Sequence, residues 1–420
     1  MKIEMKKITL FTFLLLSGAA YSSDEISSSQ NLRFDMSKAK LMIRTGREYQ
    51  AQNILTNLQA KYPKNTNILA LLADVENQSG RWINASSYLF EASSIDKDNQ
   101  SFSKYRNEII KYNKQYISLG FENETRESSD IKRSYLSFEY DLSPFREYIG
   151  ANIERREYDI ESIRRLSDGA LLAASGEVEK GELFYKKEFN DGDIAQTSLY
   201  LEESSIGAGA KYKIWNVKGS TVFAVDINEP YWDYLEGLDA DGTIDRLSVK
   251  QDLRIIPRTK SNLTLSLNRY NLEDESNLAS SLKAQLSVRY DLSRFNFFST
   301  LMGDGAAINL GYSVDAEYPF KVVTKTDLNG VIFEPLPLNS REVHTADIYI
   351  SKEFTKDLRA GAYIGYSKDR LGGKSPSFAL SANYALNDDV DVVFDAKRYV
   401  DLQNTSSKTD ILGVNLKWRY

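Results

Sequence analysis

The sequence predicts an α + β protein, in which a short α-helical module is followed by a transmembrane antiparallel β-barrel of about 16 or 18 strands. Three features predict this fold class: an N-terminal export signal, a helical period that changes to apolar–polar alternation after about residue 114, and no later stretch apolar enough for a membrane helix. An exported chain that spans a bilayer without apolar helices must close a barrel, because closure satisfies every backbone polar group in hydrocarbon. A large secreted β-sandwich or propeller is the alternative.

Composition excludes several kinds of functional site. The 420 residues include no cysteine and one histidine, which excludes disulfide scaffolds, thiol catalysis and multi-histidine metal centres. A net charge of −6 argues against nucleic acid as a partner. We therefore expect no cofactor, no metal and no enzymatic activity. The 26 tyrosines and 19 phenylalanines suit the aromatic girdles of a membrane barrel.

Two short features of the sequence invite comparison with a catalytic site and a calcium site, and both signals are weak. A serine hydrolase would need His344 beside a nucleophilic serine and an orienting carboxylate or amide, and no flanking motif supplies them. The run Asp239-Ala240-Asp241-Gly242-Thr243 resembles a calcium loop but lacks the downstream glutamate that would complete it. We interpret His344 as a residue at the outer rim of a strand and the run as a polar outer loop.

Residues 1–22 are predicted to be a secretory signal peptide. Lys2, Lys6 and Lys7 give a basic start, and a short apolar stretch over residues 8–16 follows. Small residues then lead to a cleavage site at Ala20-Tyr21-Ser22. This arrangement is typical of export signals and is too short for a membrane anchor.

Residues 31–113 are predicted to form the helical module. Gly46 and Ala51 recur as Gly80 and Ala85, each at an offset of 34 residues. Each glycine is placed where two helices turn closely, and each alanine where the second helix packs tightly. The pattern resembles two tetratricopeptide repeats with a further helix near 102–113. The resemblance implies a docking surface for partner proteins, and a plain helical spacer is the alternative.

Residues 114–420 are predicted to form the barrel. Candidate strands run about 9–13 residues, the length of a tilted strand across hydrocarbon. Candidate strands include 296–303 and 321–328, and residues 170–190 are predicted to contain one or two strands, so the total lies between 16 and 19. The turns near Ser293-Arg294, Lys356-Asp357 and Asn387-Asp388 are predicted to be periplasmic. The connections near 229–243, 272–280, 329–343, 369–374 and 401–407 are then predicted to face outside.

The last strand carries the clearest alternation. Its apolar face consists of Leu412, Val414, Leu416, Trp418 and Tyr420. A final strand of this kind resembles the terminal signal of bacterial outer-membrane barrels, which the barrel-assembly machinery reads. The resemblance implies a place in the outer membrane, in contact with its lipids, with the helical module in the periplasm.

Alternate positions of the strands predict the residues that line the lumen. The candidates are Glu139, Lys283, Arg289, Asp391, Asp395, Lys397, Lys417 and Arg419. Any water-filled barrel needs alternate polar residues, so their presence alone identifies no cargo. The net negative charge favours a cationic polymer over an anionic one.

A periplasmic repeat module ahead of a C-terminal barrel resembles the outer-membrane export porins for poly-N-acetylglucosamine, cellulose and Pel polysaccharide. The stretches Asn228-Glu229-Pro230-Tyr231-Trp232-Asp233 and Gly242-Thr243-Ile244-Asp245-Arg246-Leu247, and a strand that ends in Asn268-Arg269-Tyr270, are also similar to that group. The resemblance implies passive export of an exopolysaccharide in biofilm formation, with periplasmic or inner-membrane polysaccharide synthesis proteins as partners. This chain departs from those porins in having only two repeats.

Two other functions fit the same order of domains. A barrel with periplasmic repeats could translocate or display surface lipoproteins, or it could be a general structural or diffusion barrel whose repeats anchor a partner. All three functions need a hydrated, non-catalytic lumen, so the sequence does not separate them.

Overall fold

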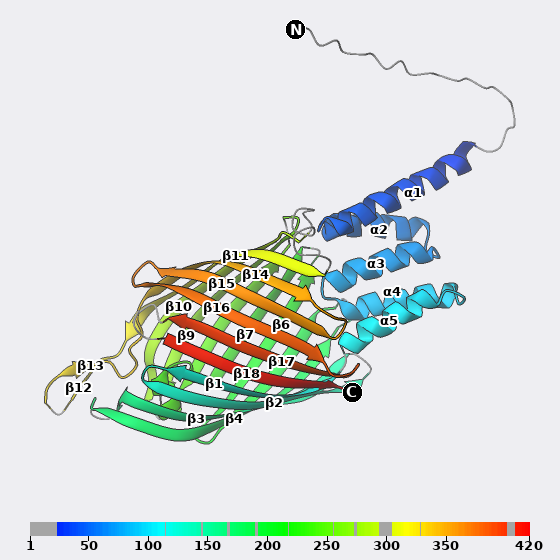
Figure 1. Cartoon of the computed structure of the whole chain (residues 1–420). Coiled ribbons are helices and arrows are strands. Elements are labelled where there is room, and N and C mark those ends of the chain that lie inside the picture. The colour runs from blue at the N-terminus through cyan, green and yellow to red at the C-terminus, as the bar shows by residue number, and fades with distance from the viewer. Residues whose placement is uncertain are drawn as a thin grey trace, which may run out of the picture.

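The chain folds into a helical module followed by a closed β-barrel (Figure 1). The computed structural model describes residues 23–420 except 114, 144–145, 166–168, 190–191, 217, 255, 273–274, 294–304, 328 and 401–407. The predicted signal peptide, the predicted strand at 296–303 and the predicted outer connection at 401–407 lie outside the described residues. Within the described residues, 16 antiparallel strands close the barrel, which confirms the predicted fold class and the lower of the two strand numbers.

The helical module starts at residue 23, earlier than the predicted residue 31. Its helices are α1 (Ser23–Arg44), α2 (Glu48–Lys61), α3 (Thr66–Gln78), α4 (Trp82–Ile95) and α5 (Gln100–Tyr112). Helices α2 and α4 begin and end 34 residues apart, and so do α3 and α5. The caps repeat as well, since the side chains of Asn65 and Asn99 accept hydrogen bonds from the first backbone N–H groups of α3 and α5.

Tight packing of small and branched side chains holds these helices together. Ala51 and Ala85 are fully buried, together with Leu55 and Leu89 one turn further on. Gly46 and Gly80 adopt φ of +74° and +86°, a left-handed conformation that glycine reaches without a steric penalty. In the described part of the chain, no helix has both the length and the apolar character that a membrane crossing requires.

The barrel strands are long and pair with their neighbours in sequence. They are β1 (Tyr116–Arg126), β2 (Ser129–Ser143), β3 (Glu147–Arg164), β4 (Leu171–Glu188), β5 (Ile194–Glu202), β6 (Ile206–Asn216), β7 (Gly219–Pro230), β8 (Thr243–Leu253), β9 (Thr259–Leu272), β10 (Glu275–Asp291), β11 (Ala306–Val322), β14 (Arg341–Glu353), β15 (Leu358–Asp369), β16 (Lys374–Ala385), β17 (Val390–Val400) and β18 (Lys408–Arg419). Strand β18 pairs with β1 and closes the sheet, while a short helix α6 (Leu235–Asp239) lies between β7 and β8.

The structure decides two points of the strand count. Residues 170–190 contain the single strand β4. The separate strand predicted at 321–328 is wrong, because β11 runs on to Val322 and only Lys325–Thr326 (β12) pairs, with Ile332–Phe333 (β13), in a small separate sheet. Strand β11 can continue past Pro319 because β10 has a register shift between Ser280 and Ser281, opposite that proline.

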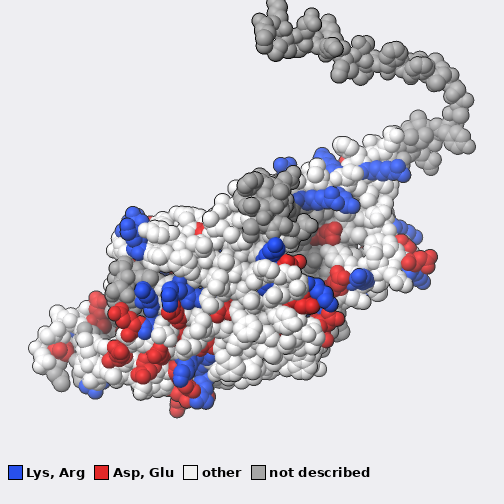
Figure 2. Space-filling model, in the orientation of Figure 1, with Lys and Arg blue, Asp and Glu red and all other residues white. Residues whose placement is uncertain are grey.

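The outer wall of the barrel is apolar. Large side chains such as Phe121, Leu380 and Leu412 are 53%, 64% and 63% exposed, whereas the residues between them are polar or small. On the face shown in Figure 2, charged side chains gather toward the end farthest from the helices, and a broad uncharged area lies between that end and the helical module. An exposed apolar belt around a closed barrel is the surface that hydrocarbon covers, so the barrel is built to span a membrane.

The helical module lies at the end of the barrel where β1 begins and β18 ends (Figure 1). We call this end the module end and the opposite one the far end. The amide of Tyr420 donates to the carbonyl of Gln115 over 3.2 Å, so both limits of the barrel sheet meet there. The turns near Lys356-Asp357 and Asn387-Asp388, which the sequence predicts on one side, both lie at the module end.

The helical module touches the barrel through its interhelical turns. Arg254, just after β8, donates a hydrogen bond to the carbonyl of Gln78, and Lys111 Nζ lies 2.6 Å from Asp388 Oδ1. A β-carbon added to Gly80 would lie 3.0 Å from the ring of Trp215 on β6. The repeated glycines therefore serve a second purpose, which is close approach to the barrel rim.

Candidate pore constriction

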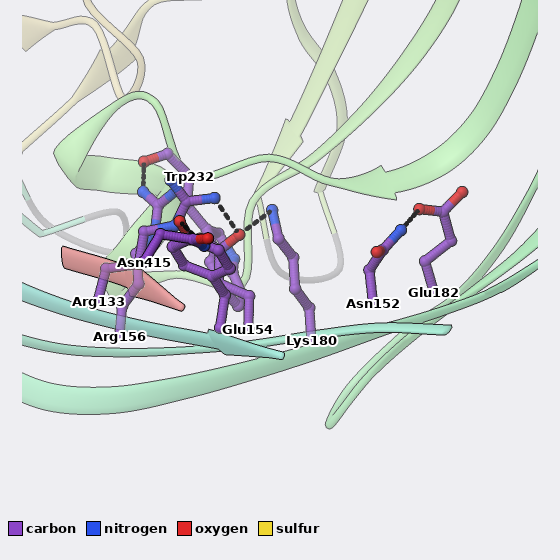
Figure 3. A network of polar contacts seen from close by, with 9 residues as sticks. Arg133, Asn152, Glu154, Arg156, Lys180, Glu182, Trp232 and Asn415 are labelled. Atoms are coloured by element: carbon purple, nitrogen blue, oxygen red, sulfur yellow. Dashed lines mark hydrogen bonds and ion pairs between the residues drawn. The ribbon is translucent and has the colours of Figure 1, made fainter. Parts of the chain in front are cut away.

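A buried carboxylate organises the inner wall near the far end. Glu154 on β3 accepts hydrogen bonds from Arg133 over 2.9 Å and from Arg156 over 2.6 Å, and Lys180 Nζ lies 3.9 Å from it (Figure 3). Register explains the cluster, because Arg133 on β2 lies directly opposite Arg156, and Glu154 lies directly opposite Lys180 on β4. Like charges placed opposite one another repel, and here the shared carboxylate compensates them.

Trp232, in the connection between β7 and β8, reaches this cluster. Its side chain is only 2% exposed, its Nε1 donates to Glu202 Oε1 over 2.8 Å, and its carbonyl accepts from Arg156 over 3.0 Å. Lys180 Nζ lies 4.5 Å from the centre of the indole ring, within range of a cation–π interaction. The connection is therefore fixed to the inner wall, as Figure 3 shows for Trp232.

The same connection contacts the opposite side of the barrel. The rings of Tyr231 and Tyr234 lie 5.5 Å and 5.8 Å from that of Tyr270 on β9. Tyr270 donates to Glu317 on β11 over 2.6 Å, and Arg341 on β14 lies 3.2 Å from the same carboxylate. Because residues 231–242 contact strands on both sides, they narrow the lumen at the far end.

The expectation of a plain polar loop around Asp239–Thr243 is therefore wrong. Leu238 is 1% exposed and Ala240 is 8% exposed, and both belong to apolar clusters inside the barrel. The cause is the apolar content of the segment, which gains more from packing on the inner wall than from water. The described residues contain no group of three or more histidine, cysteine or acidic side chains arranged to hold a metal.

A cavity of about 280 Å³, with polar and apolar lining in similar measure, opens beside the Glu154 cluster. Its lining includes Arg133, Tyr135, Ser137, Asn152, Glu154, Lys180, Glu182, Tyr200 and Glu229. Asn152 donates to Glu182 over 2.7 Å, and Ser198 donates to the other oxygen of that carboxylate over 2.6 Å. Donors, acceptors and aromatic rings thus alternate over a short distance, which is the lining that a hydroxyl-rich solute requires.

The predicted lumen residues lie elsewhere on the sheet. Glu139 pairs with Lys186 over 2.7 Å, Asp391 pairs with Arg419 over 2.5 Å, and Lys417 Nζ lies 4.0 Å from the ring centre of Tyr116. The remaining candidates are known by register: Lys283 lies between Ser266 and Glu317, Arg289 between Lys260 and Gly311, Asp395 between Ser381 and Gly413, and Lys397 between Ala379 and Ile411. None of these candidates joins the Glu154 cluster.

The predicted terminal signal forms the seam of the barrel. Val414, Leu416 and Trp418 lie opposite Phe121, Leu119 and Ile117 of β1. Tyr420 packs near Trp418, with ring centres 5.9 Å apart, and donates to the carbonyl of Glu139 over 3.0 Å. Recognition of this strand by the assembly machinery stays a prediction.

His344 lies on β14, where its ring nitrogens contact Tyr312 Oη at 2.7 Å and Glu342 Oε1 at 3.1 Å. These contacts are consistent with a surface histidine.

Sequence reasoning missed Arg133, Glu154, Arg156 and Lys180. In the run Glu154-Arg155-Arg156-Glu157 both faces of the strand carry charge, so alternation gives no inner face. The available signal was the aromatic run Tyr231-Trp232-Asp233-Tyr234. Three large aromatic side chains within four residues favour burial over exposure to solvent.

Comparison with known proteins finds similar folds and no matching sequence family. No family model and no curated protein sequence matches the chain. The chain is similar to a solved structure described as a bacterial polysaccharide outer membrane secretin, with 9% identity, 73% of this chain and 99% of that chain covered, and a TM-score of 0.53. It is also similar to OccK11 (OpdR) from Pseudomonas aeruginosa, with 9% identity, 73% and 96% covered, and a TM-score of 0.38. A further match is CdiB from Acinetobacter baumannii, with 9% identity, 73% and 60% covered, and a TM-score of 0.40. At this identity the first likeness supports the fold alone.

Proposed function

We propose that the protein is an outer-membrane channel for passive export of an exopolysaccharide, with its helical module in the periplasm. The observation that carries this proposal is the lining of the constriction, where Arg133, Glu154 and Lys180 border a cavity together with Tyr135. Sugars present hydroxyl groups at their edges and apolar faces above and below the ring. Paired charges beside the ring of Tyr135 match both surfaces without a catalytic step.

The similarity in fold to a structure described as a bacterial polysaccharide outer membrane secretin supports the same proposal. The inward connection at residues 231–242 also favours a thin, extended polymer over a folded protein, because it narrows the lumen. In this proposal the helical module docks periplasmic or inner-membrane proteins that synthesise the polymer.

A deletion strain tests the proposal. We expect loss of surface polysaccharide and biofilm, with polymer trapped in the periplasm, and restoration of both by the intact gene. Unchanged polysaccharide secretion together with a surface lipoprotein retained inside the cell would contradict export and favour protein translocation. Unchanged secretion with reduced uptake of small solutes would instead indicate a diffusion pore.

A further inference from the structure

Basic side chains gather inside the barrel at the module end. Two cavities of about 610 and 550 Å³ lie there, between the wall of the barrel and the turns of the helical module at Gly46 and Gly80. The basic residues that line one or both are Lys213, Arg254, Arg258, Lys260 and Arg289. We call Lys213, Arg254, Lys260 and Arg289, together with Trp215, the basic vestibule.

The register of the barrel strands places these basic side chains close to one another. Lys260 on β9 lies directly opposite Arg289 on β10, and Lys213 and Lys250 both pair with Val222, one from each side of β7. Like charges directly opposite in a sheet are destabilising. At the Glu154 cluster a similar opposition of arginines is compensated by a shared carboxylate that accepts hydrogen bonds from both. Among the described residues, Lys260 and Arg289 share no such ion pair, and Asp347, which lies beyond Gly311 in the same row of the sheet, interacts with Arg289 only electrostatically.

The vestibule differs in this respect from the rest of the module end. Within the described residues, Lys213, Lys250, Lys260 and Arg289 form no ion pair, whereas Glu139 and Asp391 are each held by a cation. Acidic groups are present, since Glu48, Asp252 and Asp291 also border the two cavities. Asp252 is engaged by Ser220 over 3.2 Å and by Asn262 over 2.5 Å, so it is shared among several donors. Five basic and three acidic side chains line the two cavities, so positive charge is in excess there.

An aromatic platform completes the vestibule. Trp215 lines the smaller cavity, and Lys213 Nζ lies 3.7 Å from the centre of its ring. The turn at Gly80 packs against the same ring, so the helical module holds the indole at the entrance. An indole beside several cations combines a stacking surface for a sugar ring with donors for its anionic substituents.

From this arrangement we infer that the basic vestibule admits a polyanionic glycan, a chain of sugars that carry carboxylate groups. The inference rests on the proposed export function and names the class of polymer. It departs from the expectation that the net negative charge of the chain selects a cationic polymer. Charge averaged over the whole surface does not act on a polymer that enters one end, because the charges that line the entrance dominate the local potential.

Block of single-channel current by defined oligosaccharides tests the inference on the full-length protein in planar bilayers. Oligogalacturonate added at the module end should reduce the current at concentrations at which neutral malto-oligosaccharides of equal length do not. The block should weaken as salt rises from about 0.1 to about 1 M, because screening shortens the reach of the cations. The double substitution Lys260→Gln with Arg289→Gln should raise the half-blocking concentration of oligogalacturonate about tenfold and leave the neutral sugar unchanged.

The matched control is Lys352→Gln with Lys356→Gln, which removes the same charge at the same end from residues that line neither cavity and should change neither sugar. Equal block by charged and neutral sugars, or stronger block by chitosan oligomers, overturns the inference and leaves sugar export in place. Absence of block by any sugar, together with unchanged secretion in the deletion strain, overturns the proposed function itself.

Discussion

Glu154 is the residue on which the constriction depends. Replacing it with leucine leaves Arg133, Arg156 and Lys180 close together on a buried wall without their shared carboxylate. Removal of one partner from a buried ion cluster costs roughly 3–5 kcal/mol, so Glu154→Leu should clearly lower the temperature at which the barrel unfolds in detergent. The shift in gel mobility between folded and heated protein measures that temperature.

Glu177→Leu is the matched control for that substitution. Glu177 pairs with Arg155 on exposed positions of the same strands, and its side chain is 43% exposed. An exposed pair contributes about 0–1 kcal/mol, so this variant should unfold close to the wild-type temperature. Equal losses in the two variants would contradict a special role for the buried carboxylate.

Residue-level prediction from the sequence succeeds where one face of a strand is apolar. On β18 alternation identifies Leu412, Leu416 and Trp418 as the outer face, and they are 63%, 41% and 47% exposed. It fails on β3, where Arg155 and Arg156 are both charged although they point to opposite faces. The inward fold of Trp232 depends on partners from β3, β4 and β5, which no local pattern contains.

At the scale of elements, the helices were predictable and their docking was not. The 34-residue offset recurs in the bounds of α2 and α4, because each repeat folds through its own local contacts. The contact of Gly80 with Trp215 joins residues far apart in the sequence, and no spacing in the chain indicates it. The tetratricopeptide identity of the module stays a prediction.

The docking of the helical module can be tested by chemical bridging, because the chain has no cysteine of its own. Lys111 and Asp388 form a contact of 2.6 Å, which raises the pKa of Lys111 and lowers that of Asp388, so both stay charged around neutral pH. The pair Lys111→Cys with Asp388→Cys should be bridged within one molecule by a short bis-maleimide, detected as a change in gel mobility. Lys97→Cys with Asp388→Cys is the control, since Lys97 lies between α4 and α5, away from the barrel. If both pairs were bridged at the same rate, the helical module would have no fixed position on the barrel.

At the scale of the whole molecule, one wall separates two solvents. The outer face meets hydrocarbon, and the inner face meets water and cargo, so a single charge should be costly on one face and tolerated on the other. Neighbouring residues of β18 allow this comparison at one height in the membrane. Leu412 points outward and is 63% exposed, whereas a β-carbon at Gly413 would have Glu122 Oε2 at 3.8 Å.

Leu412→Lys should destabilise the barrel by about 2–4 kcal/mol, because an ammonium group in the middle of the bilayer loses its hydration. Gly413→Lys should cost much less, since its side chain enters the lumen near the carboxylates of Glu122 and Asp395. Urea unfolding in lipid vesicles, followed by tryptophan fluorescence, measures both changes on the same scale. If Gly413→Lys proved the more harmful of the two, the assignment of inner and outer faces on β18 would have to be reversed, and with it the lumen positions of Asp395, Lys417 and Arg419.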